Sequence, residues 1–152
     1  MSGFRLLGLL AALFLLATPM TPAQAQATDF GQASLGWVNA ERARNGRGAV
    51  ALSPKLTRAA AAHAGDMAKN GYFSHTGANG SSIGDRVRRQ QYGFCFVAEN
   101  IAKGQGTLDE VLRAWMASPG HRRNMLHKRA AEFGLVRGLG NLWVMVLGRP
   151  GC

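Results

Sequence analysis

The sequence predicts an α+β fold in which helices pack around a small antiparallel sheet. Apolar residues recur at helical spacing, between recognisable helix boundaries, over most of the first half of the mature chain. Short runs of β-branched and aromatic residues follow in the second half, and a Gly-rich turn at Gly138–Asn141 joins the last two as a hairpin. Helices that precede and flank a group of antiparallel strands are typical of this fold class.

Residues 1–27 have the pattern of a secretory signal peptide. An apolar run of about a dozen residues follows the basic start of the chain, short of the roughly 20 that a membrane-spanning helix needs. Small residues at Ala25 and Ala27 offer cleavage sites. We expect cleavage after Ala25 or Ala27, which leaves residues 28–152 as a single domain. An uncleaved membrane anchor is the alternative.

The chain contains two cysteines, Cys95 and Cys152, both in the expected mature part. Export to an oxidising compartment, the periplasm or the extracellular space, favours a disulfide between them. A loop closure of this length stabilises a fold by roughly 4 kcal/mol in the chain-entropy account. The alternative is a nucleophilic cysteine with a histidine partner.

The mature chain is strongly basic. Of the 18 Lys and Arg residues only Arg5 lies in the expected leader, so 17 remain against 8 acidic residues, a net charge of about +9. Outside the cytoplasm such a charge favours anionic lipid or a cell-envelope polymer as partner, although a basic surface that only binds water is the alternative. The sequence carries no nucleic-acid-binding module and, after the leader, no stretch apolar enough to span a membrane. We expect a monomer.

Three helices are expected in the first half of the mature chain. Ser53 and Pro54 suit a helix cap and a first helical position, and Asn-Gly pairs end two of the helices. Residues 28–32 have no such signals and are expected to form a flexible terminus. The expected helices are Ala33–Arg44, Pro54–Asn70 and a helix from Ser81 or Ser82 to Gly93.

Strands and two further helices are expected in the second half. Thr107 and Glu110 have the pattern of a capping box that opens a helix. Pro119 ends that helix, and Ser118 is placed to cap a short helix that follows at once. The expected strands are Phe94–Ile101, Phe133–Val136 and Leu142–Leu147. The last of these is almost wholly apolar, so we expect it at the centre of the sheet.

Candidate site residues lie on three separate predicted elements: His75 in a loop, Glu99 on a strand and His121 at a helix start. Two imidazoles and a carboxylate suit a divalent transition metal with an open coordination position, or a proton-transfer site without metal. Scattered residues of these types are also common in purely structural roles. Metalloprotease, serine-hydrolase, P-loop and dinucleotide-binding motifs do not occur, which argues against the commoner enzyme classes.

The position of His121 adds a physical argument. The first turn of a helix carries partial positive charge, which disfavours the protonated imidazole. The adjacent Arg122 and Arg123 act in the same direction. We therefore expect a neutral ring, the form that binds a metal or accepts a proton.

Four sequence blocks occur in order along the chain. They are Tyr72-Phe73-Ser74-His75, Ala98-Glu99-Asn100-Ile101-Ala102, the stretch from Trp115 to Leu126 with Ser-Pro-Gly-His at its centre, and the hairpin from Gly134 to Val144. Together they resemble the CAP superfamily (cysteine-rich secretory proteins, antigen 5 and pathogenesis-related 1), also called SCP-like. The resemblance extends from about residue 33 to the end and is closest to the compact single-domain bacterial members.

The resemblance implies a three-layer α-β-α sandwich with a small central antiparallel sheet and a groove that holds two histidines and two acidic residues. His75, Glu99 and His121 match three of these four groups. Ser118 stands at the position of the second acid. Any site for zinc or another divalent metal is therefore expected to be weak, because a hydroxyl replaces one ligand and one negative charge.

Four further residues are assigned supporting roles. His63 is expected to pack or hydrogen-bond beside the groove, and Asn100 and Asn124 are expected to brace the backbone. Ser118 is expected to be a helix cap rather than a nucleophile. We assign no catalytic residue.

The function that the resemblance implies is that of a secreted binding module, whose groove takes a divalent metal or a lipid-like ligand. One alternative is a hydrolase of protein or cell wall, dependent on His and Glu side chains or on a metal. Another is an extracellular scaffold with a vestigial site. Enzymatic activity stays open, and binding is favoured.

Overall fold

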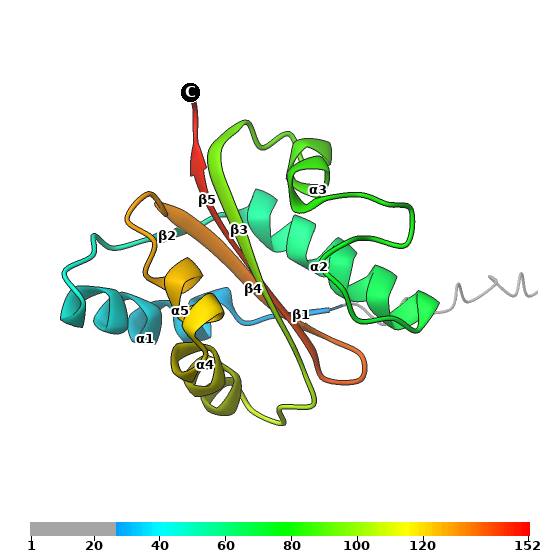
Figure 1. Ribbon diagram of the computed structural model, residues 1–152, viewed down its shortest axis with the longest axis horizontal. Coiled ribbons are helices and arrows are strands. Elements are labelled where there is room, and N and C mark those ends of the chain that lie inside the picture. The colour runs from blue at the N-terminus through cyan, green and yellow to red at the C-terminus, as the bar shows by residue number, and fades with distance from the viewer. Residues whose placement is uncertain (1–26) are drawn as a thin grey trace, which may run out of the picture.

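A computed structural model of the chain describes residues 27–152 (Figure 1). The signal peptide expected over residues 1–27 lies outside the described residues, apart from Ala27, and stays a prediction. The helices are α1 (Gly31–Arg44), α2 (Pro54–Asn70), α3 (Ile83–Arg89), α4 (Leu108–Ala117) and α5 (Pro119–Met125). The strands are β1 (Thr28–Asp29), β2 (Ala51–Leu52), β3 (Phe94–Lys103), β4 (Glu132–Gly138) and β5 (Leu142–Pro150). Within residues 27–152 no helix is both long and apolar enough to cross a bilayer.

The strands form one sheet in the order β1-β4-β5-β3, and β2 pairs with β4. The long strands β3, β4 and β5 are antiparallel, whereas β2 runs parallel to β4. Every residue of β5 from Leu142 to Gly148 is buried, because this strand has a partner on both sides and helices over both faces. The prediction of an apolar central strand is confirmed.

Two hydrophobic cores lie on opposite faces of the sheet. Alternate residues of a strand point to opposite faces, so Trp143 enters one core and Val144 the other. The first core includes Trp115 of α4, and the second includes Leu56 of α2. Figure 1 shows α1, α4 and α5 on one side of the sheet and α2 and α3 on the other. The α-β-α sandwich that the resemblance implied is confirmed.

The start of the domain is ordered, so the expectation of a flexible terminus over residues 28–32 is wrong. β1 pairs with β4 in antiparallel register, and α1 begins at Gly31 rather than at Ala33. The Asp29 carboxylate accepts a hydrogen bond from the Gly31 N–H at 2.7 Å. A two-residue strand has no periodicity of its own, and its pairing is specified by the strand beside it.

Two of the four predicted helix caps are present; the cap predicted at Ser53 is absent, and that at Ser118 is described with the site. Ser82 and Thr107 each form a capping box at the start of α3 and α4. Ser53 precedes α2, with Pro54 at the first helical position, but its side chain makes no cap hydrogen bond. Its N–H donates to the Phe133 carbonyl at 2.9 Å. Ser53 therefore continues the pairing of β2 with β4 up to the start of the helix.

α2 lies directly on β4 at a point where only glycine fits. A Cβ added to Gly134 would lie 2.2 Å from the backbone nitrogen of Thr57. Ala60 and Ala64, both buried, keep the rest of the helix close to the sheet. This packing brings His63, on the same helix, into the interior.

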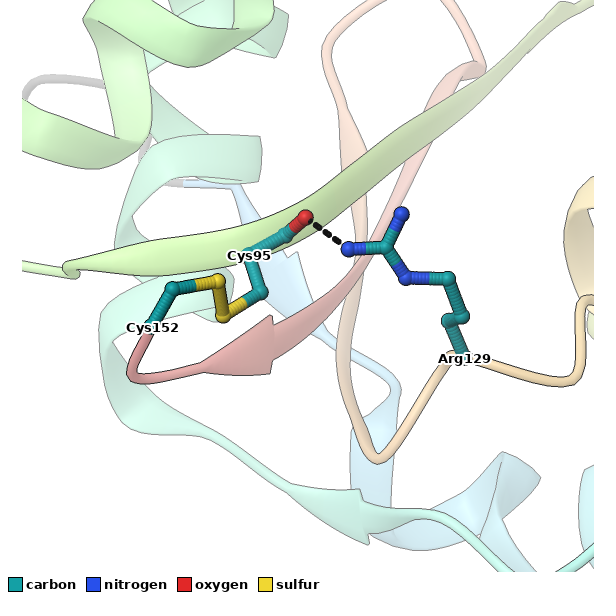
Figure 2. Close-up of a disulfide and its surroundings, with 3 residues drawn as sticks. All are labelled: Cys95, Arg129 and Cys152. Atoms are coloured by element: carbon teal, nitrogen blue, oxygen red, sulfur yellow. Dashed lines mark hydrogen bonds between the residues drawn. A yellow bond between two sulfur atoms is a disulfide. The ribbon is translucent and has the colours of Figure 1, made fainter.

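The predicted disulfide between Cys95 and Cys152 is confirmed (Figure 2). It joins β3 to the end of the chain, between Cα atoms 5.3 Å apart and residues 57 apart in sequence. Closing a loop of this length stabilises the fold by about 4 kcal/mol in the chain-entropy account. The Arg129 guanidinium donates to the Cys95 carbonyl, as Figure 2 shows, and links β3 to the segment before β4.

Gly134→Ala is expected to destabilise the fold, because the added methyl group would meet the backbone of α2 rather than a movable side chain. We expect the free energy of unfolding to fall by about 3 kcal/mol, the scale of severe overpacking. Gly65→Ala on α2, with open space around the added Cβ, is the matched control. It should raise the free energy of unfolding by about 0.5–1 kcal/mol. Urea unfolding measures both, and an unchanged midpoint for Gly134→Ala contradicts the close contact.

Candidate functional site

A buried carboxylate, Glu99 on β3, lies at the centre of the candidate site. Its side chain is only 2% exposed. Oε1 lies 2.8 Å from His75 Nδ1, and Oε2 accepts a hydrogen bond from Arg86 Nη2 at 2.8 Å. His63 Nε2 lies 3.8 Å from Oε1. We call His75, Glu99 and His121 the histidine site.

Arg86 is the residue of this site that the sequence reasoning missed. Its side chain is buried on α3, and besides the ion pair it donates from Nη1 to the Ser81 carbonyl at 2.9 Å. It follows the apolar Ile83 by three residues, on the same face of α3, and this spacing was the signal that could have identified it. A buried cation beside Glu99 removes the free negative charge that the metal prediction assumed.

His75 extends over Glu99 from the loop after α2, with its side chain 59% exposed. An ionised carboxylate only accepts hydrogen bonds, so His75 Nδ1 carries the proton of their contact. In the neutral ring the lone pair then lies on Nε2. In metal sites generally, a carboxylate that is hydrogen-bonded to one imidazole nitrogen orients the other nitrogen toward the metal.

His63 supports this loop from the interior. It is fully buried on α2, and its Nε2 lies 2.8 Å from the Ser74 carbonyl. Because a carbonyl only accepts, Nε2 donates and Nδ1 carries the lone pair, and Nδ1 is buried without a hydrogen-bond partner. Burial is the main cause that lowers the pKa of His63, while Glu99 acts in the opposite direction. His63 is therefore a neutral structural support.

A second carboxylate, Asp66 on α2, holds the loop on both sides of His75. It accepts hydrogen bonds from the Tyr72 hydroxyl and, at 3.0 Å, from the Ala78 N–H. Burial and then the contact with Asp66 raise the pKa of Tyr72 to about 12. The same contact is the main cause that lowers the pKa of Asp66. Asp66 thus attaches the loop to α2 on both sides of His75.

His121 reaches the site from α5. The chain passes from α4 to α5 at Ser118, as predicted, but the Ser118 side chain makes no cap hydrogen bond. Its Oγ instead lies 3.0 Å from His121 Nδ1, so the predicted cap is wrong. Burial, and then the neighbouring His75, lower the pKa of His121. The expected neutral form is therefore favoured, with burial rather than the helix end as its main cause.

Asn100 and Asn124 attach α5 to β3. The Asn124 amide donates to the Glu99 carbonyl at 3.2 Å and to Asn100 Oδ1 at 2.9 Å. The Asn100 amide donates in turn to the His121 carbonyl at 3.1 Å. These bonds connect the strand that carries Glu99 with the helix that carries His121, and so they set the spacing of the histidine site.

The carboxylate of the site is not free to bind a cation. Both oxygens of Glu99 are engaged, and Ser118 contributes no negative charge. Among the residues that the structure describes, no three His, Cys, Asp or Glu side chains come together as a metal-binding group. His75 and His121 can supply two nitrogen ligands, with the other coordination positions open to water or a ligand. Two protein ligands make a weak site.

Comparison with known sequences points to one family. The model of the cysteine-rich secretory protein family, CAP, matches residues 35–142. The uncharacterized Bacillus subtilis protein YkwD is 36% identical over 97 residues, which are 64% of this chain and 38% of YkwD. The uncharacterized membrane protein YlbC of Bacillus subtilis is 28% identical over 97 residues, which are 64% of this chain and 28% of YlbC. The chain thus spans well under half the length of these two relatives.

Solved structures share the fold. An extracellular protein with an SCP domain from Bacillus anthracis superposes with a TM-score of 0.73 at 29% identity, over 78% of this chain and 39% of that protein. An outer surface protein from Borrelia burgdorferi gives a TM-score of 0.72 at 19% identity, over 82% and 98% of the two chains. A cysteine-rich secretory protein from Staphylococcus aureus gives 0.67 at 14% identity, over 86% and 40%. The last two likenesses are of the fold alone.

Removal of either partner of the Arg86–Glu99 pair is expected to leave an uncompensated buried charge. Arg86→Gln and Glu99→Gln should each lower the free energy of unfolding by about 3–5 kcal/mol. The double variant should lose less than the sum of the two, because both charges leave together. Arg89→Gln, at an exposed position of the same helix, is the matched control and should change little. Strictly additive losses in urea unfolding would contradict a direct pair.

Stability is expected to fall as the pH drops below about 6.5, the ordinary pKa of histidine. The pKa of His63 is lower in the folded chain, so between the two pKa values only the unfolded chain takes up the proton, and acid favours unfolding. His121 and His127 act in the same direction. His63→Gln keeps a donor for Ser74 and should flatten the pH dependence of urea unfolding between about pH 5 and pH 8. An unaltered pH dependence in this variant argues against a buried neutral His63.

Proposed function

The chain belongs to the cysteine-rich secretory protein family, and on that basis we propose that it is an extracellular binding module whose histidine site holds a divalent cation such as zinc. The contact of 2.8 Å between His75 Nδ1 and Glu99 Oε1 carries the proposal. The carboxylate orients the imidazole and leaves the lone pair of Nε2 for the cation. His121, kept neutral by burial, supplies the second nitrogen.

The contacts of the two Glu99 carboxylate oxygens favour cation binding over hydrolysis. A general base needs a carboxylate oxygen within reach of the proton that it removes. Oε1 lies against His75 and Oε2 against Arg86, each at 2.8 Å. Glu99 therefore has a positioning role, and the cation that it helps to place would use its open coordination positions for a ligand.

The partner that we propose is an anionic group on the cell envelope, either a lipid head group or a charged polymer. The leader pattern and the disulfide support a location outside the cytoplasm. The similar Bacillus anthracis protein is described as extracellular, and the Borrelia burgdorferi protein as an outer surface protein. The mature charge of about +9 would attract such a partner. Its oxygen atoms would complete the coordination of the cation.

Hydrolysis is a second candidate, favoured by one contact. Ser118 Oγ lies 3.0 Å from His121 Nδ1, the distance at which a histidine takes the proton of a serine nucleophile. The carboxylate that would orient the imidazole in such a pair, Glu99, contacts His75 instead. Ser118→Ala separates the two functions, because it should abolish hydrolysis and leave cation binding in place.

Calorimetric titration with zinc chloride tests the proposed function. We expect saturable binding by the mature protein and no binding by His75→Ala/His121→Ala. Glu99→Gln, with its fold checked by circular dichroism, should bind about 10- to 100-fold more weakly, as is usual when the group that orients a metal-binding histidine is lost.

His127→Ala removes a histidine outside the site and is the matched control, so it should bind zinc like the wild type. If the His75→Ala/His121→Ala variant binds zinc as tightly as the wild type, the proposed site is wrong. If the wild type does not bind zinc, the scaffold alternative is favoured.

A further inference from the structure

Two segments of the chain, residues 42–50 and residues 118–131, carry positive charge without any acidic residue. Glu41 and Glu132 flank them, but Glu41 forms an ion pair within α1, and Glu132 neighbours Tyr92 in the core on the opposite face of the sheet. The positive charges of the two segments are therefore not balanced by acidic neighbours along the chain. The basic residues that they contain are Arg42, Arg44, Arg47, Arg122, Arg123, Lys128 and Arg129.

The buried side chain of Arg42 joins the two segments into one face. It is only 1% exposed, and it donates to the Gly48 carbonyl at 2.8 Å and to the Met125 carbonyl at 2.7 Å. It also donates to the His127 and Ala130 carbonyls, each at 3.2 Å. Met125 is the last residue of α5, so the guanidinium compensates the partial negative charge at that end of the helix. Figure 1 shows α1 and α5 on the same side of the sheet.

The turn that follows α5, residues 127–130, is fixed by stacking and hydrogen bonds. The His127 ring lies against the Phe96 ring, with centroids 4.0 Å apart and planes 8° apart. His127 Nδ1 accepts a hydrogen bond from the Arg129 N–H at 3.2 Å, so Nε2 carries the proton of the neutral ring. The Arg129 guanidinium donates to the Cys95 carbonyl, as Figure 2 shows. The turn therefore presents its charges from a fixed backbone.

The cations of the two segments lie close enough to act on one another. Burial is the main cause that lowers the pKa of His127, and the charges of Arg129, Lys128, Arg42 and Arg47 lower it further. On the α1 side, Arg122 Nη2 donates to Asn45 Oδ1 at 3.1 Å, which places α5 beside the end of α1. Like charges held close together repel one another, and a bound anion would relieve that repulsion.

We propose that this surface, which we call the basic face (Arg47, Arg122, Arg123, Lys128 and Arg129), binds a linear phosphodiester polymer of the cell envelope. All five side chains are exposed, and four of them follow one another along α5 and the turn, as negative charges repeat along such a polymer. Four of the five are arginines, whose planar guanidinium groups match phosphate oxygens in pairs. The proposal rests on the extracellular location and the anionic partner of the proposed function, but not on the cation.

A polymer fits the basic face better than a lipid bilayer does. A protein that docks on a bilayer through its own surface inserts apolar side chains among the head groups, in addition to charge attraction. Within residues 27–152 the exposed large apolar side chains are Phe73 and Leu139, and neither belongs to the basic face. The basic face therefore offers charge without an apolar anchor.

The test is an NMR titration of the ¹⁵N-labelled mature protein with an oligomer of glycerol phosphate, in EDTA so that no divalent cation contributes. We expect saturable shifts of the backbone amides in residues 45–48 and 122–129. The affinity should fall steeply as salt is added, because binding releases counterions from the oligomer. Absence of saturable shifts in these two segments, or an affinity that salt does not change, would overturn the proposal.

Arg47→Gln/Lys128→Gln removes two cations of the basic face whose side chains make no hydrogen bond or ion pair among the described residues. Its thermal midpoint should stay unchanged, whereas its affinity for the oligomer should fall at least about tenfold and depend less steeply on salt. Lys69→Gln/Arg89→Gln, at exposed positions of α2 and α3 on the other side of the sheet, is the matched control and should keep the wild-type affinity. Equal losses in the two double variants would overturn the proposal in favour of non-specific attraction.

Two further probes separate the classes of partner. Polygalacturonate of equal charge, which has carboxylates in place of phosphates, should bind at least about threefold more weakly. Equal or tighter binding of polygalacturonate contradicts the phosphodiester assignment. Vesicles of phosphatidylglycerol and phosphatidylcholine should bind more weakly than the oligomer at equal phosphate concentration, and tighter binding to the vesicles means that the partner is a membrane. His75→Ala/His121→Ala should leave the oligomer titration unchanged, so a failure of zinc binding and a failure of polymer binding are distinguishable.

Discussion

The structure depends on a buried ion pair. The Glu99 carboxylate is buried away from water, and the Arg86 guanidinium beside it compensates its negative charge. A buried carboxylate with no partner would take up a proton or be drawn to the surface. The pair joins α3 to β3, while contacts to His63 and His75 add α2 and its following loop. Four consecutive segments of the chain, α2, the loop after it, α3 and β3, are thus arranged around one charge.

The same pairing decides what the histidine site can do. Because Arg86 and His75 occupy both carboxylate oxygens, Glu99 orients an imidazole instead of acting as a free base or ligand. The amide chain through Asn100 and Asn124 then fixes α5, and with it His121, beside the strand. In the proposed function the cation is left to two imidazoles, because Ser118 offers a hydroxyl where the family resemblance implies a second acid.

Local signals predicted most of the fold. The capping box at Thr107, the helix start at Ser81 or Ser82 and the apolar run of β5 were predicted from residues close together in sequence, and the structure has all three, with Ser82 as the cap. Ser53 and Ser118 were predicted as caps from equally good local patterns, yet neither side chain caps its helix. A competing partner accounts for Ser118, whose hydroxyl contacts the His121 ring. At Ser53 the structure shows only that the backbone N–H pairs with the edge of β4.

The sequence by itself determined the α+β class, the central strand and the family resemblance. Hydrophobic periodicity, helix caps and ordered motifs each depend on residues that are close together in sequence. It also identified His75, Glu99 and His121 as candidates. Only the tertiary structure decided that Arg86 turns inward to meet Glu99, since an ion pair across 13 residues depends on how α3 packs against β3.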